Sequence, residues 1–125
     1  MSLAALLMFG LVVLTEPVVV VEGDRFDAGG VRYGVADLDA PETNGRCPAE
    51  RALARLATAE ARAAFATAST VTVEVVDVQP ATARFRERLV ARVSLDGQDL
   101  ATRLVEADVA RWDRDRGRWC ETIRE

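Results

Sequence analysis

The order of extended and helical segments most constrains how this 125-residue chain can fold. Five segments bounded by turn residues, most of them rich in β-branched residues, predict short strands: residues 18–21, 25–27, 31–38, 69–78 and 86–95. Strong helix formers fill residues 49–66 after Pro48, which predicts one long helix, and residues 100–109 predict a second. We therefore expect an α+β, mainly β domain over residues 17–125, a five-stranded OB-fold barrel with two to three helices.

The first 16 residues form a separate hydrophobic N-terminal segment. Residues 3–14 are apolar except for Gly10, as in the hydrophobic part of an export signal, and about 12 residues are too few to cross a bilayer comfortably. No basic residue precedes the run, and no small-x-small cleavage site follows it. We expect an export signal or a membrane anchor, and the alternative is a buried strand or helix at the start of the domain.

Composition restricts the chemistry of the chain. It contains no histidine and no lysine, so imidazole bases and imidazole metal ligands are excluded and every cationic side chain is an arginine. The formal net charge is −4. An acidic protein attracts phosphate only through a local basic patch or a bound cation.

The two cysteines, Cys47 and Cys120, are far apart in the sequence. They could form one disulfide or remain two buried thiols, and sequence alone does not decide between these states. A disulfide would require an oxidising compartment.

Six acidic residues gather at two places, the first turn and the end of the third strand: Glu22, Asp24 and Asp27, and Asp37, Asp39 and Glu42. If the first and third strands pair, the two groups meet. Carboxylates that share a site repel one another unless a cation lies between them. The hard cation that prefers oxygen ligands is Ca²⁺. The alternative is that these are solvated turn residues at strand ends.

Several motifs resemble the staphylococcal nuclease (thermonuclease) family. They are Val20-Val21-Glu22-Gly23-Asp24, Asp39-Ala40-Pro41-Glu42-Thr43, Cys47-Pro48-Ala49-Glu50-Arg51-Ala52, and Arg88-Leu89-Val90-Ala91-Arg92-Val93 before Asp96-Gly97. The resemblance covers roughly residues 18–110 in the family's order, and Asp-Ala-Pro-Glu is its most specific element.

The resemblance implies a Ca²⁺-dependent nuclease that cleaves phosphodiester bonds of DNA and RNA. Asp24, Asp39 and the carbonyl of Ala40 would be Ca²⁺ ligands, Glu42 the general base and Arg88 a phosphate-binding catalytic residue. The implied substrate is single-stranded DNA or RNA, and the implied protein is a monomer.

The C-terminal tail also resembles members of this family. It contains Arg-Gly-Arg-Trp-Cys at residues 116–120, as in exported-looking members, and the resemblance implies a Cys47–Cys120 disulfide and a periplasmic or secreted protein.

The chain departs from the family pattern where a second catalytic arginine is expected, because that position is Gly34. Arg32 lies two residues earlier on the same strand face and could partly substitute as a phosphate contact. The threonine of the family's Gly-Asp-Thr turn is replaced by Arg25. Three hypotheses remain: a weakened nuclease, a catalytically degenerate module that binds nucleic acid or a protein partner, and a structural module held to the membrane by its N-terminus.

Overall fold

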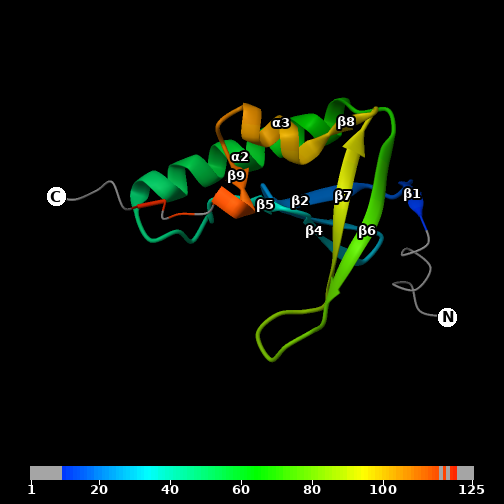
Figure 1. Ribbon diagram of the computed structural model, residues 1–125, viewed down its shortest axis with the longest axis horizontal. Helices are drawn as coiled ribbons and strands as arrows, with labels where there is room; N and C mark the ends of the chain where they lie inside the picture. Colours follow the sequence, from blue (N-terminus) through cyan, green and yellow to red (C-terminus); the bar gives the residue numbers. More distant parts are fainter. Residues whose placement is uncertain (1–9, 116, 118, 121–125) are drawn as a thin grey trace.

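The computed structural model describes residues 10–115, 117, 119 and 120. Its elements follow in this order: β1 (Leu11–Leu14), β2 (Val18–Glu22), β3 (Arg25–Ala28), β4 (Val31–Val35), β5 (Leu38–Asp39), α2 (Pro48–Thr67), β6 (Val71–Gln79), β7 (Arg88–Leu95), β8 (Gln98–Asp99), α3 (Leu100–Glu106), β9 (Arg111–Trp112) and a 3₁₀ turn, η1 (Asp113–Asp115). The fold is mixed α+β and mainly β, as predicted (Figure 1).

Seven strands form one mixed sheet in the order β1-β6-β7-β4-β3-β2, with β8 added beside β7. The β4–β7 pairing is parallel and the other pairings are antiparallel. This sheet differs from the expected five-stranded barrel, because it has two further strands and is not closed. Its path begins at β1 and ends at β2, two consecutive strands that residues 15–17 separate. Pro17 has no backbone N–H to donate to a ladder, which is consistent with the interruption there.

The third predicted strand is shorter than expected. It ends at Val35, and Asp37 turns the chain with a positive φ of 64°. The next two residues, Leu38 and Asp39, form β5, which pairs with β9 in a separate two-stranded sheet. This pairing brings residues 111 and 112 of the C-terminal tail beside the Asp39 segment.

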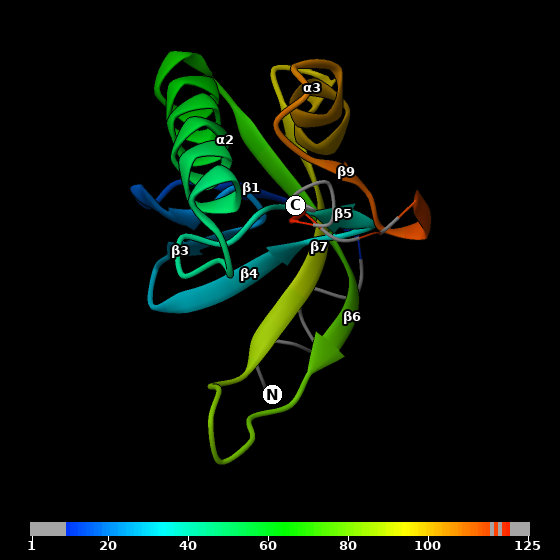
Figure 2. The ribbon, with the colours of Figure 1, turned by 90° about the vertical axis from the view of Figure 1, so that its left-hand side faces the viewer.

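Both helices lie on the same side of the large sheet, and residues 80–87, which join β6 to β7, project away from them (Figures 1 and 2). Helix α2 packs on β2 and α3, and α3 also packs on β7. The buried stripe of α2 is lined with alanines, among them Ala54, Ala57, Ala61 and Ala64. A Cβ at Gly23 would lie 3.0 Å from the Ala57 Cβ, so a glycine there allows this close approach. Leu56 is an apolar residue of the same helix, but it is 60% exposed because it lies off this stripe.

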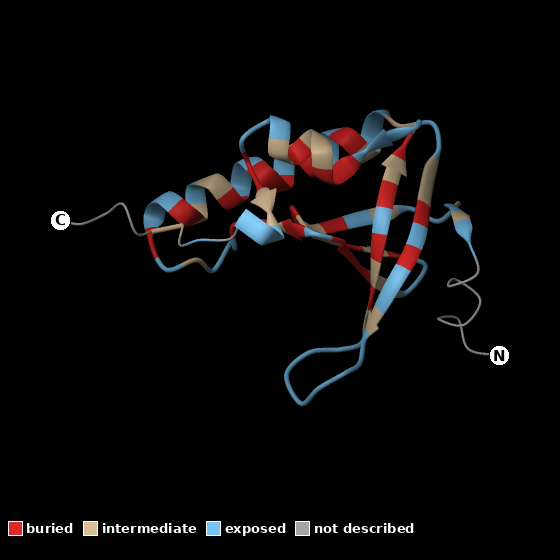
Figure 3. Ribbon diagram, in the orientation of Figure 1, coloured by how far each residue is buried: buried red, intermediate tan, exposed pale blue. Residues whose placement is uncertain are grey.

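The core follows the period-two alternation predicted for the strands (Figure 3). On β7, Leu89, Ala91, Val93 and Leu95 are all buried. Phe26 stacks on Tyr33 of the neighbouring strand, with ring centroids 5.1 Å apart. These contacts fix β3 and β4 relative to one another.

Part of the predicted N-terminal segment belongs to the sheet. Residues Leu11–Leu14 form the edge strand β1 and pair with β6. They are a strand, as in the alternative, but not a buried one, because Leu11 and Val13 are exposed. Residues 3–9 of the predicted signal lie outside the described part of the chain. Within the described residues, neither helix combines the length and apolar character needed to cross a membrane.

A disulfide joins Cys47 to Cys120, so the predicted pairing is confirmed. The two Cα atoms are 6.1 Å apart, and 73 residues separate the cysteines in the sequence. The bond ties the C-terminal tail to the start of α2, where Cys47 is the N-cap residue. It indicates that the protein folds in an oxidising compartment.

Candidate active site

A large open cleft of about 1370 Å³ runs beside β3, β4 and β7. Ordinary small-molecule pockets measure roughly 300–1,000 Å³, so this cleft could accept a longer, polymeric ligand. It is lined by every residue that the sequence analysis assigned to metal, catalysis or phosphate: Asp24, Arg32, Asp39, Ala40, Glu42 and Arg88. Asp37 and Glu22 of the acidic groups also line it, as does Cys120 of the disulfide.

Asp24 lies in the turn between β2 and β3. Its carbonyl oxygen accepts a hydrogen bond of 2.9 Å from the backbone N–H of Val35, at the end of β4. The β2–β3 register shifts between Val20 and Glu22, an irregularity that ends the regular pairing just before this turn. The first and third predicted strands do not pair with each other, because β3 lies between β2 and β4. The Asp24 turn still lies beside the end of β4, through the hydrogen bond from Val35.

Burial dominates the electrostatics of Asp24. It raises the pKa of the Asp24 carboxyl from 3.8 to about 6, opposed by the nearby Arg25 guanidinium and by a hydrogen bond from the Ala40 backbone, and assisted by the charge of Glu22. The Arg25 Nε lies 3.8 Å from the Asp24 carboxylate. Ionisation of a carboxyl in such surroundings costs additional free energy, and a bound cation would offset that cost by stabilising the carboxylate.

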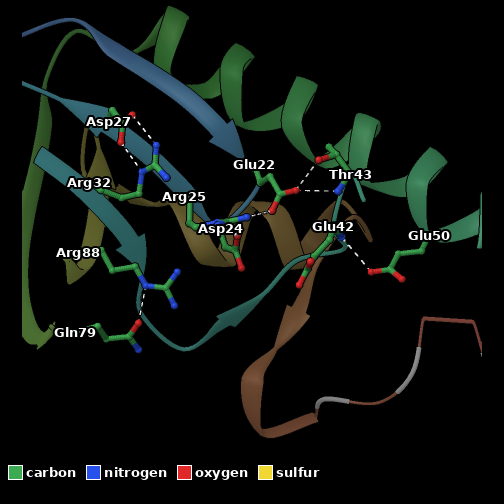
Figure 4. A network of polar contacts seen from close by, with 10 residues as sticks. All are labelled: Glu22, Asp24, Arg25, Asp27, Arg32, Glu42, Thr43, Glu50, Gln79 and Arg88. Atoms are coloured by element: carbon green, nitrogen blue, oxygen red, sulfur yellow. Dashed lines mark hydrogen bonds and ion pairs between the residues drawn. The ribbon is translucent and has the colours of Figure 1, made fainter. Parts of the chain in front are cut away.

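Glu22 links the first turn to the loop after β5 (Figure 4). One carboxylate oxygen contacts the Arg25 guanidinium, and the other accepts hydrogen bonds from the backbone N–H and the hydroxyl of Thr43, at 2.8 and 2.7 Å. Burial alone would raise the pKa of Glu22, but the Thr43 hydrogen bonds and Arg25 together hold it below its ordinary value. Glu22 is therefore an ionised carboxylate that fixes Arg25 and the Thr43 loop in place.

Glu42 lies in the loop that leads to α2, and Glu50 holds this loop. The carboxylate of Glu50 accepts hydrogen bonds of 3.1 Å from the backbone N–H groups of Glu42 and Arg46. A Cβ at Gly45 would lie 2.5 Å from Glu50, so a glycine is needed where the loop passes over this side chain. The sequence analysis missed Glu50. The available signal was a glutamate three residues after the helix N-cap, the position that bonds back to loop N–H groups in a capping box.

Arg88 stands at the start of β7 and extends over Gly34. Its Cδ and Nε lie 3.6 Å from the position that a Gly34 Cβ would occupy. Its Nε donates a hydrogen bond of 2.6 Å to the Gln79 side-chain oxygen, and Gln79 was not anticipated as a site residue. Arg32 is held differently, because its guanidinium donates two hydrogen bonds, of 2.7 and 2.9 Å, to Asp27.

The donor set of this site is chemically suited to a hard divalent cation. Asp24 and Asp39 offer carboxylate oxygens and Ala40 offers a carbonyl, which are ligand types of Ca²⁺. Within the described part of the chain, no three acidic or thiol side chains lie together as a ready-made metal site. A cation held by two carboxylates and one carbonyl would therefore take its remaining oxygen ligands from water and from substrate. The observation that fits such an ion is the burial of Asp24, whose effect Arg25 and the Ala40 hydrogen bond offset only in part.

Comparison with protein-family models and with curated proteins finds no match.

Proposed function

We propose that this protein is a Ca²⁺-dependent nuclease of reduced activity that hydrolyses phosphodiester bonds in single-stranded DNA or RNA. The observation that carries the proposal is the convergence of Asp24, Asp39, Ala40, Glu42 and Arg88, from separate segments of the chain, on one cleft. A cleft that combines carboxylates with arginines suits a polyanionic substrate whose charge is neutralised by both a cation and guanidinium groups.

Each residue has a defined task in this proposal. Asp24, Asp39 and the Ala40 carbonyl would hold the cation, which when bound neutralises a phosphate oxygen and acts as a Lewis acid. Glu42 would orient a water molecule and take its proton as general base. Arg88 would bind the phosphate and stabilise the charge that develops on it. Glu50 is a positioning residue, because it fixes the backbone N–H of Glu42.

The same proposal includes a fold and a location. We infer an OB-fold relationship in which β1 and β2 correspond to two halves of one long strand, since they stand at opposite ends of the sheet path and only residues 15–17 separate them. Export to the periplasm or the outside of the cell, with residues 3–14 as signal or anchor, is supported by the Cys47–Cys120 disulfide. A monomer suffices, because every proposed site residue comes from one chain.

The test is cleavage of a fluorescently labelled single-stranded oligonucleotide, as DNA and as RNA, with Ca²⁺ and with EDTA. Wild-type protein should cleave only with Ca²⁺, and Glu42→Gln should abolish cleavage while Ca²⁺ affinity stays within about twofold, since this change removes the base and none of the proposed ligands. Cleavage by Glu42→Gln at the wild-type rate would remove Glu42 from the mechanism. Full activity in EDTA would remove the cation.

A second candidate function is nucleic-acid or protein binding without cleavage. The observation that favours it is Gly34, a cleft-lining residue that supplies no guanidinium. The loss of a transition-state arginine can lower phosphoryl-transfer rates by on the order of 10³–10⁵. Tight binding of the oligonucleotide with no cleavage in Ca²⁺ would select this function over the first.

A further inference from the structure

Three adjacent strands, β3, β4 and β7, supply the residues between which a phosphate could sit. Arg25 of β3, Gly34 of β4 and Arg88 of β7 all line the cleft. Side chains on a strand alternate between its two faces, and on β7 Arg88 and Val90 line the cleft whereas Leu89 and Ala91 are buried in the core. On the cleft side of this part of the sheet, Gly34 therefore has one arginine on each side, Arg25 on β3 and Arg88 on β7.

The β3–β4 register places Arg25 and Arg32 opposite different residues. Asp27 is paired directly with Arg32, and the two form a bidentate ion pair that also lowers the pKa of Asp27. Arg25 is paired directly with Gly34. Directly opposed residues of an antiparallel pair have Cβ positions about 4.5–5.5 Å apart on the same face. Arg25 thus stands across from a position with no side chain, whereas Arg32 is paired with the residue directly opposite it. Both arginines have anionic partners, since Arg25 contacts Glu22 and lies 3.8 Å from Asp24.

Arg88 reaches the same glycine from the other side. Gly34 is paired with Val90 of β7, and the Arg88 side chain lies 3.6 Å from the position of a Gly34 Cβ. Arg88 donates a hydrogen bond to the neutral amide of Gln79, and among the described residues it makes no ion pair. Neighbouring strands are about 4.8 Å apart, so the backbones of β3 and β7 stand roughly 10 Å apart with Gly34 between them. This spacing leaves room for a phosphate group between two guanidinium groups.

We propose that Arg25 is a second phosphate-binding residue, and that Arg25 and Arg88 flank one phosphate of a single-stranded nucleic acid over Gly34. The inference rests on the proposed function for the identity of the ligand. Glu22 holds the Arg25 guanidinium and is itself held by Thr43, so the cation is oriented before substrate arrives (Figure 4). In this arrangement β3 supplies the guanidinium that β4 lacks at Gly34.

The test measures the affinity for a fluorescein-labelled single-stranded DNA oligonucleotide by anisotropy, with Ca²⁺ present. All variants carry Glu42→Gln so that the probe stays intact. Arg25→Gln and Arg88→Gln should each weaken binding about tenfold and lower the salt dependence by about one phosphate contact. Arg32→Gln should stay within about twofold. Arg103→Gln is the matched control, since Arg103 forms an ion pair with Glu60 of α2 away from the cleft.

Two further variants separate a lost contact from a lost fold. Arg25→Lys keeps a cation beside Glu22 but loses the guanidinium fork, so it should fold normally and bind more weakly than the parent. Arg25→Thr combined with Gly34→Arg moves the guanidinium to the neighbouring strand. A side chain at Gly34 meets only ordinary contacts, and the backbone there has no positive φ. This double variant should recover affinity relative to Arg25→Thr alone.

Unchanged affinity in Arg25→Gln, a loss confined to Arg32→Gln, or no binding by the parent would each overturn the inference. Failure of this inference about Arg25 can be distinguished from failure of the proposed nuclease function. Arg25-dependent binding without cleavage by wild type refutes only the nuclease, and cleavage with affinity unchanged in Arg25→Gln refutes only the role of Arg25.

Discussion

Replacing Asp24 by asparagine should stabilise the protein at neutral pH, although it removes a proposed Ca²⁺ ligand. The pKa of Asp24 is raised from 3.8 to about 6 by burial, so ionisation of this carboxyl is unfavourable in the folded state. A shift of this size corresponds to about 3 kcal/mol at pH values above 6. The side chain is 26% exposed, so solvent screening reduces the effect, and we expect Asp24→Asn to gain about 1–3 kcal/mol at pH 7.

The sign of the pH dependence follows from the direction of the shift. The folded protein binds the Asp24 proton more tightly than the unfolded chain does. The stability associated with Asp24 is therefore fully present below pH 3.8, is lost as the pH rises toward 6, and stays lost above that. The advantage of Asp24→Asn over wild type should be largest at pH 7 and nearly absent at pH 4.

Urea unfolding of both proteins at pH 7 and pH 4, without divalent cations, measures this difference. Because only the difference between the two proteins is compared, the other titrating carboxylates cancel to first order. Added Ca²⁺ should raise the unfolding midpoint of wild type and leave that of Asp24→Asn unchanged. An Asp24→Asn protein that is less stable than wild type at pH 7, or a difference that does not change with pH, would refute the reasoning.

Three other predictions concern the elements that frame the site. Glu50→Ala leaves two loop N–H groups without their acceptor, so it should lower the free energy of unfolding, measured by urea titration, by about 1–3 kcal/mol. It should also lower kcat in the cleavage assay, whereas the Ca²⁺ affinity measured by calorimetry should not change. Gly45→Ala places a Cβ against Glu50 and should destabilise by a similar amount, but the Gly45→Ala/Glu50→Ala double variant should lose less than the two single variants together; additive losses would contradict the contact. Reduction of the disulfide removes the link between Cys47 and Cys120, which lie 73 positions apart in the sequence, and should lower the free energy of unfolding by about 4 kcal/mol on the chain-entropy estimate. An unchanged urea midpoint in dithiothreitol would contradict this.

Much of the fold could be predicted from local patterns. Alternation of β-branched residues located the main strands, and the alanine-rich run after Pro48 located α2 to within one residue at each end. The Asp37 turn and the β5–β9 pairing could not be predicted in this way, because they depend on contacts between segments more than 70 residues apart. The exposure of Leu56 shows the same limit, since the buried stripe of α2 is set by the sheet that it covers.

The candidate site shows the same division between local and long-range information. The residues of the Asp-Ala-Pro-Glu motif and the Gly-Asp turn could be named from the sequence, and the sheet brings them to one cleft. The arrangement of the arginines could not be predicted, because it depends on strand register. A shift of β3 by one residue would turn Arg25 to the other face of the sheet and would separate Asp27 from Arg32. The sequence does not show the irregularity near Val20 that accompanies the observed register.

The central claim, that Asp24 and Asp39 hold a divalent cation in this cleft, is tested most directly by calorimetric titration of Ca²⁺ into the oxidised protein with a single-stranded oligonucleotide present. We expect one saturable site per chain in Glu42→Gln protein, with binding lost when either Asp24→Asn or Asp39→Asn is added. Equal Ca²⁺ binding with and without these two carboxylates, or no saturable binding at all, would contradict the account.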